Sequence, residues 1–221
     1  MNDHPDPLRR RTLIALLGGG VSLSASLRVA AQLATVEGMR EVRGDVRING
    51  IRAVPGMRVA AGDSVRTASG ALAVFSIGQD AFLMRANSRA EFSGQDVAID
   101  GLRLVSGKLL GVFGTGGPRR LQTATAVIGI RGTGAYLETE RRRTYFCLCY
   151  GRAEIATANG SARDTYTTVH HESPRYIYGD GRRRPIVMAN VANHTDDELT
   201  MLEALLGRTP PAEFMASPYR Y

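Results

Sequence analysis

From Met39 to Ala189 the sequence is a regular succession of short β-type segments, each followed by a turn signal of two or three residues. No stretch within this region keeps a helical period for three turns. The pairs Asn49-Gly50 and Asn159-Gly160 favour hairpins, because Asn and Gly tolerate the positive φ angles of a type I′ turn. We therefore predict an all-β fold, a meander of short antiparallel strands forming a β-roll or sandwich, with one C-terminal α-helix.

Other glycine-containing segments are interpreted in the same way. Gly78-Gln79-Asp80 and Asp100-Gly101 are predicted to be turns between strands, and Gly179-Asp180-Gly181 follows a strand over 176–178. The segment 129–134 lacks the Gly-Lys-Ser/Thr ending of a phosphate loop, and no helical pattern follows it. Its glycines are predicted instead to let two strands approach closely or to form a bulge.

The helix is predicted over a leucine-rich stretch late in the chain. Thr195 and Glu198 have the spacing of a capping box, and Gly207 stands where a C′ residue is expected. Leucines at 199, 202, 205 and 206 form one apolar stripe. We expect this stripe to pack against the protein's own sheet.

The first 31 residues have the features of an export signal. Arg9–Arg11 precede an apolar run over 12–21 that is too short to span a bilayer, and Val29-Ala30-Ala31 supplies small residues before a cleavage site. The paired arginines resemble a twin-arginine (Tat) signal. We therefore predict a periplasmic protein with four parts: the export signal (1–31), a linker (32–39), the β domain (40–189), and a capping helix with its tail (190–221).

The chain is basic, with 28 Lys and Arg against 21 Asp and Glu and a formal net charge of +7. Arginine clusters lie at 119–120, 141–143 and 182–184, each beside a turn signal. Because no aromatic residues alternate with them on one face, we do not predict nucleic-acid binding. Solvated turns are the first interpretation, and a scaffold that binds anionic glycan or lipid is the alternative.

Catalytic motifs are absent from the sequence. It contains neither a G-x-S-x-G nucleophile elbow nor an H-E-x-x-H metal motif. We predict a protein that is not an enzyme, with no catalytic residues and, as the first interpretation, no cofactor.

Two cysteines share the strand-like segment 145–150. Because side chains alternate along a strand, Cys147 and Cys149 are predicted to share a face with Tyr145, whereas Tyr150 takes the other face. An apolar run on both faces is typical of a buried strand. Buried structural thiols are therefore the first interpretation of the two cysteines.

The alternatives for these cysteines are redox chemistry and a metal or haem site. Two thiolates on one face could bind one soft metal ion, and His170 or His171 could add a nitrogen ligand. The candidate metal ligands are Cys147, Cys149, His170 and His171. Adjacent residues of a strand point to opposite faces, so at most one of the two histidines is expected to join the thiolates.

The order of several motifs resembles the FecR-like domain, the periplasmic part of the ferric-citrate regulator family. The segment 62–67 is similar to its GD-x-[IV]-x-T step, and 123–133 is similar to its T-P-x-A-x-x-x-x-R-G-T signature, with Ala124 in place of the proline. Further matches lie between these two segments and beyond them: Gly70, Ala73, Phe75, Leu104, Ser106, Gly107, Leu109 and Tyr136. The resemblance covers about Val42 to Leu137.

The resemblance implies a β-rich periplasmic module without defined catalytic residues. Full-length regulators of that family carry a cytoplasmic anti-sigma segment and a membrane helix before the domain. Only eight residues precede Arg9 here, so we expect that segment to be missing and do not carry over sigma-factor control. The predicted function is an exported, non-enzymatic module that binds an envelope protein or a small ligand, with a role in envelope sensing or signalling; the membrane is involved only through the export signal.

Overall fold

The computed structural model describes residues 37–218 and residue 221. All of the described residues belong to one compact unit. The predicted export signal therefore lies outside the described residues, as does most of the predicted linker.

The described residues form strands followed by two short helices. Their bounds in chain order are β1 (Gly38–Arg43), β2 (Val46–Ile48), β3 (Ile51–Arg52), β4 (Ser64–Thr67), β5 (Leu72–Ile77), β6 (Asp80–Met84), β7 (Arg89–Gln95), β8 (Ala98–Val112), β9 (Arg119–Gln122), β10 (Ala126–Thr139), β11 (Arg143–Thr157), β12 (Arg163–Thr168), β13 (Arg175–Tyr178), β14 (Ile186–Met188), α1 (Asp196–Leu205) and α2 (Ala212–Met215). The predicted all-β class is confirmed. Neither described helix has the length and apolarity that a membrane crossing requires.

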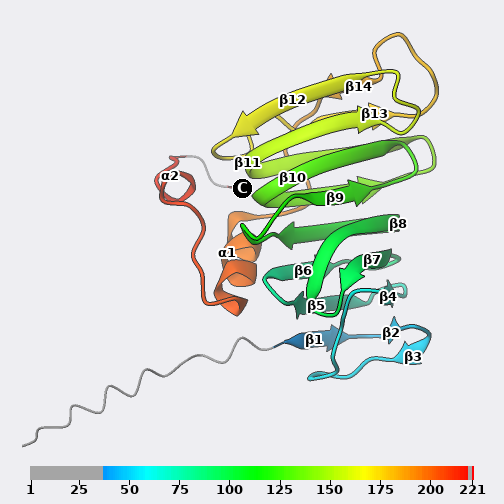
Figure 1. Ribbon diagram of the computed structural model, residues 1–221, viewed down its shortest axis with the longest axis vertical. Coiled ribbons are helices and arrows are strands. Elements are labelled where there is room, and N and C mark those ends of the chain that lie inside the picture. Colours follow the sequence, from blue (N-terminus) through cyan, green and yellow to red (C-terminus); the bar gives the residue numbers. More distant parts are fainter. Residues whose placement is uncertain (1–36, 219–220) are drawn as a thin grey trace, which may run out of the picture. The chain divides into compact units, whose positions relative to one another are not determined.

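All of these strands join one mixed sheet, shown in Figure 1. Neighbouring strands are antiparallel, except that β8 and β9 run parallel. Three long strands change partners along their length. β8 pairs first with β7 and then with β6, β10 pairs first with β9 and then with β8, and β11 pairs first with β13 and then with β12. The sheet thereby folds over itself into two layers around a continuous apolar core.

The partner changes occur where the long strands are irregular. In β10 the register with β11 shifts between Arg131 and Gly134, which confirms the predicted bulge within 129–134. In β11 the corresponding position is Gly151, whose φ of +98° is open to glycine and strained for other residues. A Cβ at this position would lie 2.6 Å from the Thr133 side chain, so the strands also approach closely here.

Most predicted turns are present, and one is in the wrong place. Asn49 and Gly50 have φ angles of +50° and +84°, as a type I′ hairpin requires. Asp100-Gly101 does not turn: β8 continues through it with a bulge at Asp100, and the chain turns earlier, at Asp96-Val97. Gly101 serves a different purpose, because a Cβ there would lie 2.4 Å from the carbonyl oxygen of Arg120 on the neighbouring β9.

A matched pair of alanine substitutions tests this explanation of Gly101. Gly101→Ala should lower the free energy of unfolding by about 1–3 kcal/mol, because the added methyl group meets backbone atoms that cannot move aside cheaply. Gly129→Ala, also within the sheet, should be tolerated, since its Cβ would meet only Glu154 at 4.0 Å. Urea denaturation of both variants measures the difference, and equal stabilities would contradict the explanation.

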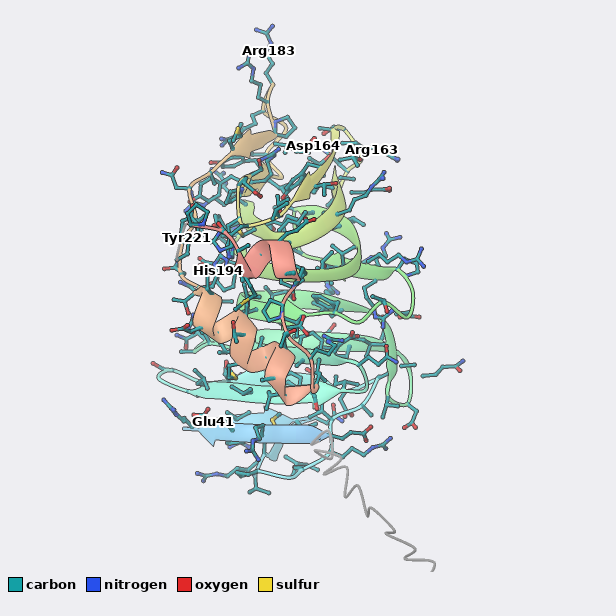
Figure 2. The ribbon with its side chains drawn as sticks, turned by 90° about the vertical axis from the view of Figure 1, so that its left-hand side faces the viewer. Glu41, Arg163, Asp164, Arg183, His194 and Tyr221 are labelled. Atoms are coloured by element: carbon teal, nitrogen blue, oxygen red, sulfur yellow. The ribbon has the colours of Figure 1, made fainter. Side chains whose placement is uncertain are left out.

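A second apolar core lies on the outer face of one layer, beneath the C-terminal segment (residues 189–218 and 221). It includes side chains of β5, β6, β8, β10 and β11 together with Leu199, Leu202 and Phe214. Figure 2 shows α1 lying across these strands, with His194 at its beginning. The helix prediction is confirmed: the Thr195–Glu198 capping box is formed, and Gly207 follows with a φ of +66°. Leu199 and Leu202 are buried, whereas Leu205 and Leu206 are half-buried, and the short α2 was not predicted.

Candidate metal centre

Strand β11 carries Cys147 and Cys149 into the second core, and both are fully buried free thiols. Tyr145 shares their face, as predicted. The prediction for Tyr150 was wrong, because this residue also faces the second core. The reason is a bulge: Gly134 pairs with Tyr150 and the next residue of β10, Ala135, pairs with Leu148, so the alternation of side chains is reset after Cys149.

Two histidines from different parts of the chain converge on these thiols. His171 follows β12 in a loop, with a φ of +59°, and its Nδ1 lies 3.3 Å from the Sγ of Cys147. His194 immediately precedes the N-cap of α1, and its Nε2 lies 3.1 Å from the Nδ1 of His171. One ligand atom from each of Cys147, Cys149, His171 and His194 lies within 4.8 Å of every other, and all four residues are buried.

His170 does not join this group. Its Nε2 lies 3.1 Å from Asp196 Oδ2, while its Nδ1 is buried with no hydrogen-bond partner in the described part of the chain. The structure therefore brings together three of the four residues singled out from the sequence, and one histidine of the adjacent pair faces the thiols. The fourth member of the cluster, His194, was missed. No spacing rule links it to the cysteines, because it belongs to the segment that folds back over the sheet.

The hydrogen bonds around the two histidines define which nitrogen carries a proton. His171 Nε2 is 3.1 Å from Asp196 Oδ1, and a carboxylate can only accept, so this nitrogen donates. His194 Nδ1 is 2.8 Å from the carbonyl oxygen of Ala192 and donates as well. In the neutral rings, the remaining nitrogens then direct lone pairs at each other across 3.1 Å. Such an arrangement needs a metal ion or a proton between them.

The two thiols differ in acidity. Burial opposes ionisation of Cys147, but its interactions with Cys149, His171 and His194 outweigh burial and hold the pKa of this thiol well below its usual value. Burial and the adjacent Cys147 raise the pKa of Cys149 well above its usual value. Thiolate is the form that binds metals, and the low pKa of Cys147 favours this form. Cys149 would release its proton when a metal ion binds.

Aromatic rings enclose the cluster. Tyr136 stacks on His194 with ring centroids 4.5 Å apart, and Phe214 of α2 lies against both His170 and His171. The Tyr221 ring is 5.2 Å from that of His171, and the Tyr221 carbonyl oxygen accepts a hydrogen bond from the backbone N–H of Asp196. The C-terminal segment thus supplies His194 as a candidate ligand, the Asp196 carboxylate that orients His171, and part of the apolar cover.

Comparisons with known proteins leave the family open. No protein-family model matches the chain, and no curated protein sequence matches it. Two crystal structures of a "putative anti-sigma factor" from Parabacteroides distasonis ATCC 8503 are similar to part of it, each with a TM-score of 0.47 and 11% sequence identity, covering 57% of this chain and 59% of that one. The chain therefore spans less than two thirds of the length of these matches. A likeness this remote assigns no function, and the FecR-like resemblance stays a prediction.

Proposed function

We propose that this protein is an exported, non-enzymatic module of the cell envelope that binds one zinc ion through Cys147, Cys149, His171 and His194. The observation that carries the metal site is the pair of imidazole nitrogens that face each other across 3.1 Å, each with its other nitrogen committed to an acceptor. The Arg9–Arg11 leader and the FecR-like motifs support the envelope location and a role in sensing or signalling.

The donor set favours zinc. Two thiolates and two imidazoles form the Cys₂His₂ set of structural zinc sites, which are tetrahedral. Ideal Zn–N and Zn–S lengths place two nitrogens about 3.3 Å apart and a nitrogen and a sulfur about 3.6 Å apart. The corresponding distances here, 3.1 Å and 3.3 Å, need only a small expansion.

Other metal groups fit less well. Haem iron takes its protein ligands along one axis from either side of a flat ring, whereas these four atoms converge within 4.8 Å of one another. An iron–sulfur cluster divides its ligands between separate irons and would hold them further apart. A single ion is therefore the proposed occupant.

The ion would have a structural role. Four protein ligands leave no open position for substrate or water, and burial of all four residues closes the centre from solvent. Cys147, Cys149 and His171 belong to the sheet and the loop that follows β12, whereas His194 belongs to the C-terminal segment. The ion would fasten this segment over the second core, and Asp196 would orient His171 as an outer-shell partner.

Elemental analysis tests the proposal directly. Protein purified under reducing conditions without chelators should contain about one zinc per chain, as expected for a single four-ligand site. Replacement by Co²⁺ should give the absorption of a tetrahedral thiolate complex. Reduced protein that neither retains zinc nor takes it up after reconstitution would refute the metal site. Fractionation of cells that produce the full chain tests the proposed location independently.

A further inference from the structure

We infer a second binding site, for an acidic polysaccharide, on the outer face of strands β9 to β12. This face belongs to the other layer of the folded sheet from the one that carries the metal centre, and the inference does not depend on zinc. The inward side chains of these strands, among them Leu121, Ile128 and Ile155, fill the first core. The alternate side chains point outward, and many of them are arginines.

The strand register gathers these arginines from distant parts of the sequence. Across the sheet, Arg120 lies opposite Gly129, which lies opposite Glu154. Two residues along, on the same face, Val127 lies opposite Ala156, which lies opposite Arg163. In the opposite direction along the strands, Arg131 and Arg152 form a direct pair. Arg103 on β8 adjoins the group beside Gln122.

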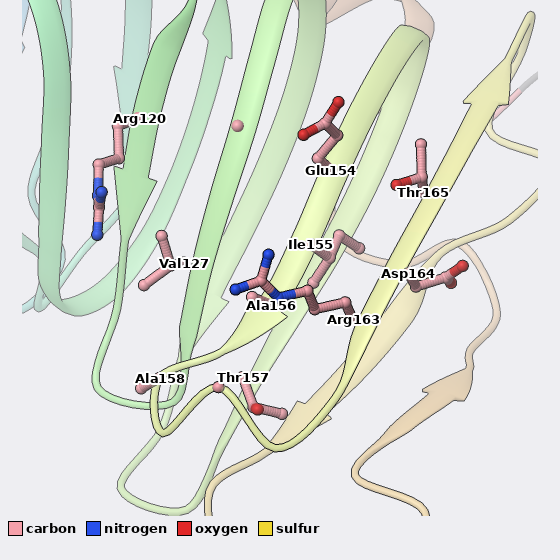
Figure 3. A pocket seen from close by; sticks show the side chains of 12 residues that line it. Arg120, Val127, Glu154, Ile155, Ala156, Thr157, Ala158, Arg163, Asp164 and Thr165 are labelled. Atoms are coloured by element: carbon pink, nitrogen blue, oxygen red, sulfur yellow. The ribbon is translucent and has the colours of Figure 1, made fainter.

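The face is hollowed along these rows. Three adjoining depressions have volumes of about 530, 680 and 260 Å³, and Gly129 lines all of them. Arg120 lines the two larger depressions and Glu154 lines the first and the smallest. Figure 3 shows the Arg163 side chain extending from β12 over β11 towards β10, with Arg120 on the far side of Val127. Because a glycine occupies the shared position, no side chain divides the groove.

Six arginines and four carboxylates line the three depressions, which leaves the groove with an excess of positive charge. Within the described part of the chain, the side chains of Arg103, Arg120, Arg131 and Arg163 are exposed and make no ion pair or hydrogen bond. The carboxylates that line the groove already have partners. Glu91 lies 2.9 Å from Arg89, and Asp100 accepts a hydrogen bond from the Ser93 hydroxyl. Glu154 lies 3.7 Å from Arg152, and Asp164 lies 2.9 Å from Arg175. The turn clusters noticed in the sequence did not reveal this surface, since only Arg120 belongs to one of them.

The ligand that fits is an extended chain with repeated anionic groups. A guanidinium presents a planar fork to a carboxylate, sulfate or phosphate. In an open groove each such contact is weak and screened by salt, so a ligand needs several of them at once. Neighbouring strands are about 4.8 Å apart, which places the arginines at intervals that a substituted sugar chain can span. Phe92 is the one aromatic residue that lines the three depressions, and its ring is buried in the first core, so nucleobases would find no exposed stacking platform.

Binding measurements on a charge-reversal variant test the site. The native protein should bind polygalacturonate and dextran sulfate, with an affinity that falls steeply between low and physiological salt, and should not bind neutral dextran. The double variant Arg120→Glu/Arg163→Glu should lose about tenfold or more in affinity for both acidic polymers. Gly129→Val, which keeps the charge and fills the floor of the groove, should also weaken binding.

The matched control changes charge by the same amount elsewhere. Arg183→Glu/Arg184→Glu alters the loop between β13 and β14, where Figure 2 shows Arg183 projecting away from the sheet. This control should leave affinity within about twofold, apart from the general effect of net charge. Equal losses in the two double variants would overturn the site in favour of non-specific attraction. Tighter binding of a single-stranded DNA 30-mer, or binding confined to phosphatidylglycerol vesicles, would overturn the choice of polysaccharide.

Discussion

A Cys147→Ser variant is expected to lose its stoichiometric zinc and to unfold with a free energy lowered by more than about 4 kcal/mol, because a four-ligand structural site is disrupted at the centre of a core. The substitution hardly changes side-chain volume, so loss of packing contributes little. Zinc content and urea denaturation in the presence and absence of a chelator measure the two effects. In this variant the chelator should no longer change stability.

His170→Gln is the matched control for this expectation. His170 is as buried as the ligands, is adjacent to His171 and shares Asp196 with it, yet does not face the thiols. Its replacement should leave one zinc per chain. His194→Gln should behave like Cys147→Ser, and Asp196→Asn should weaken zinc binding by about 10–100-fold without abolishing it. If His170→Gln loses zinc while His194→Gln keeps it, the assigned ligand set is wrong.

Removal of residues 195–221 should lower the melting temperature by more than about 10 °C. The deletion exposes the outer face of the sheet and removes Leu199, Leu202 and Phe214, each buried to 1% exposure or less. Burial of each such side chain contributes about 1.5–3 kcal/mol before the entropy of ordering is subtracted. Calorimetry of the truncated and intact proteins, both measured without zinc, separates this loss from that of the metal centre.

Two leucine substitutions measure how much individual side chains of the C-terminal segment contribute to stability. Leu202→Ala should cost about 2–5 kcal/mol because it leaves a cavity in the second core. Leu206→Ala, in the half-buried position after α1, should cost about 1 kcal/mol. A truncated protein with an unchanged melting temperature would show that the C-terminal segment is not an integral part of the domain, and that it is available to bind a partner.

Local chemistry made much of the fold predictable. Asn49-Gly50 forms its hairpin, and Thr195 with Glu198 caps α1, because each signal acts through neighbouring residues alone. Asp100-Gly101 misled the prediction for the same reason: a glycine required for a close approach by β9 cannot be distinguished locally from one required for a turn. The prediction for Tyr150 failed because the face that its side chain takes is set by a bulge, and this bulge depends on the register with β10.

The same distinction between local and tertiary effects applies to the candidate sites. The sequence by itself determined that the protein is all-β and that Cys147 and Cys149 share one face. The structure decided which histidine faces the thiols, because His170 and His171 lie in the loop after β12, where the alternation of a strand does not apply. Tertiary structure also decided that His194 joins the thiols and that arginines from β8 to β12 line one groove. The physical reason is the distance along the chain over which each effect acts. Alternation, capping and turn preferences act over a few residues, whereas a ligand set and a charged face arise from strands and loops that are paired only after the chain has folded.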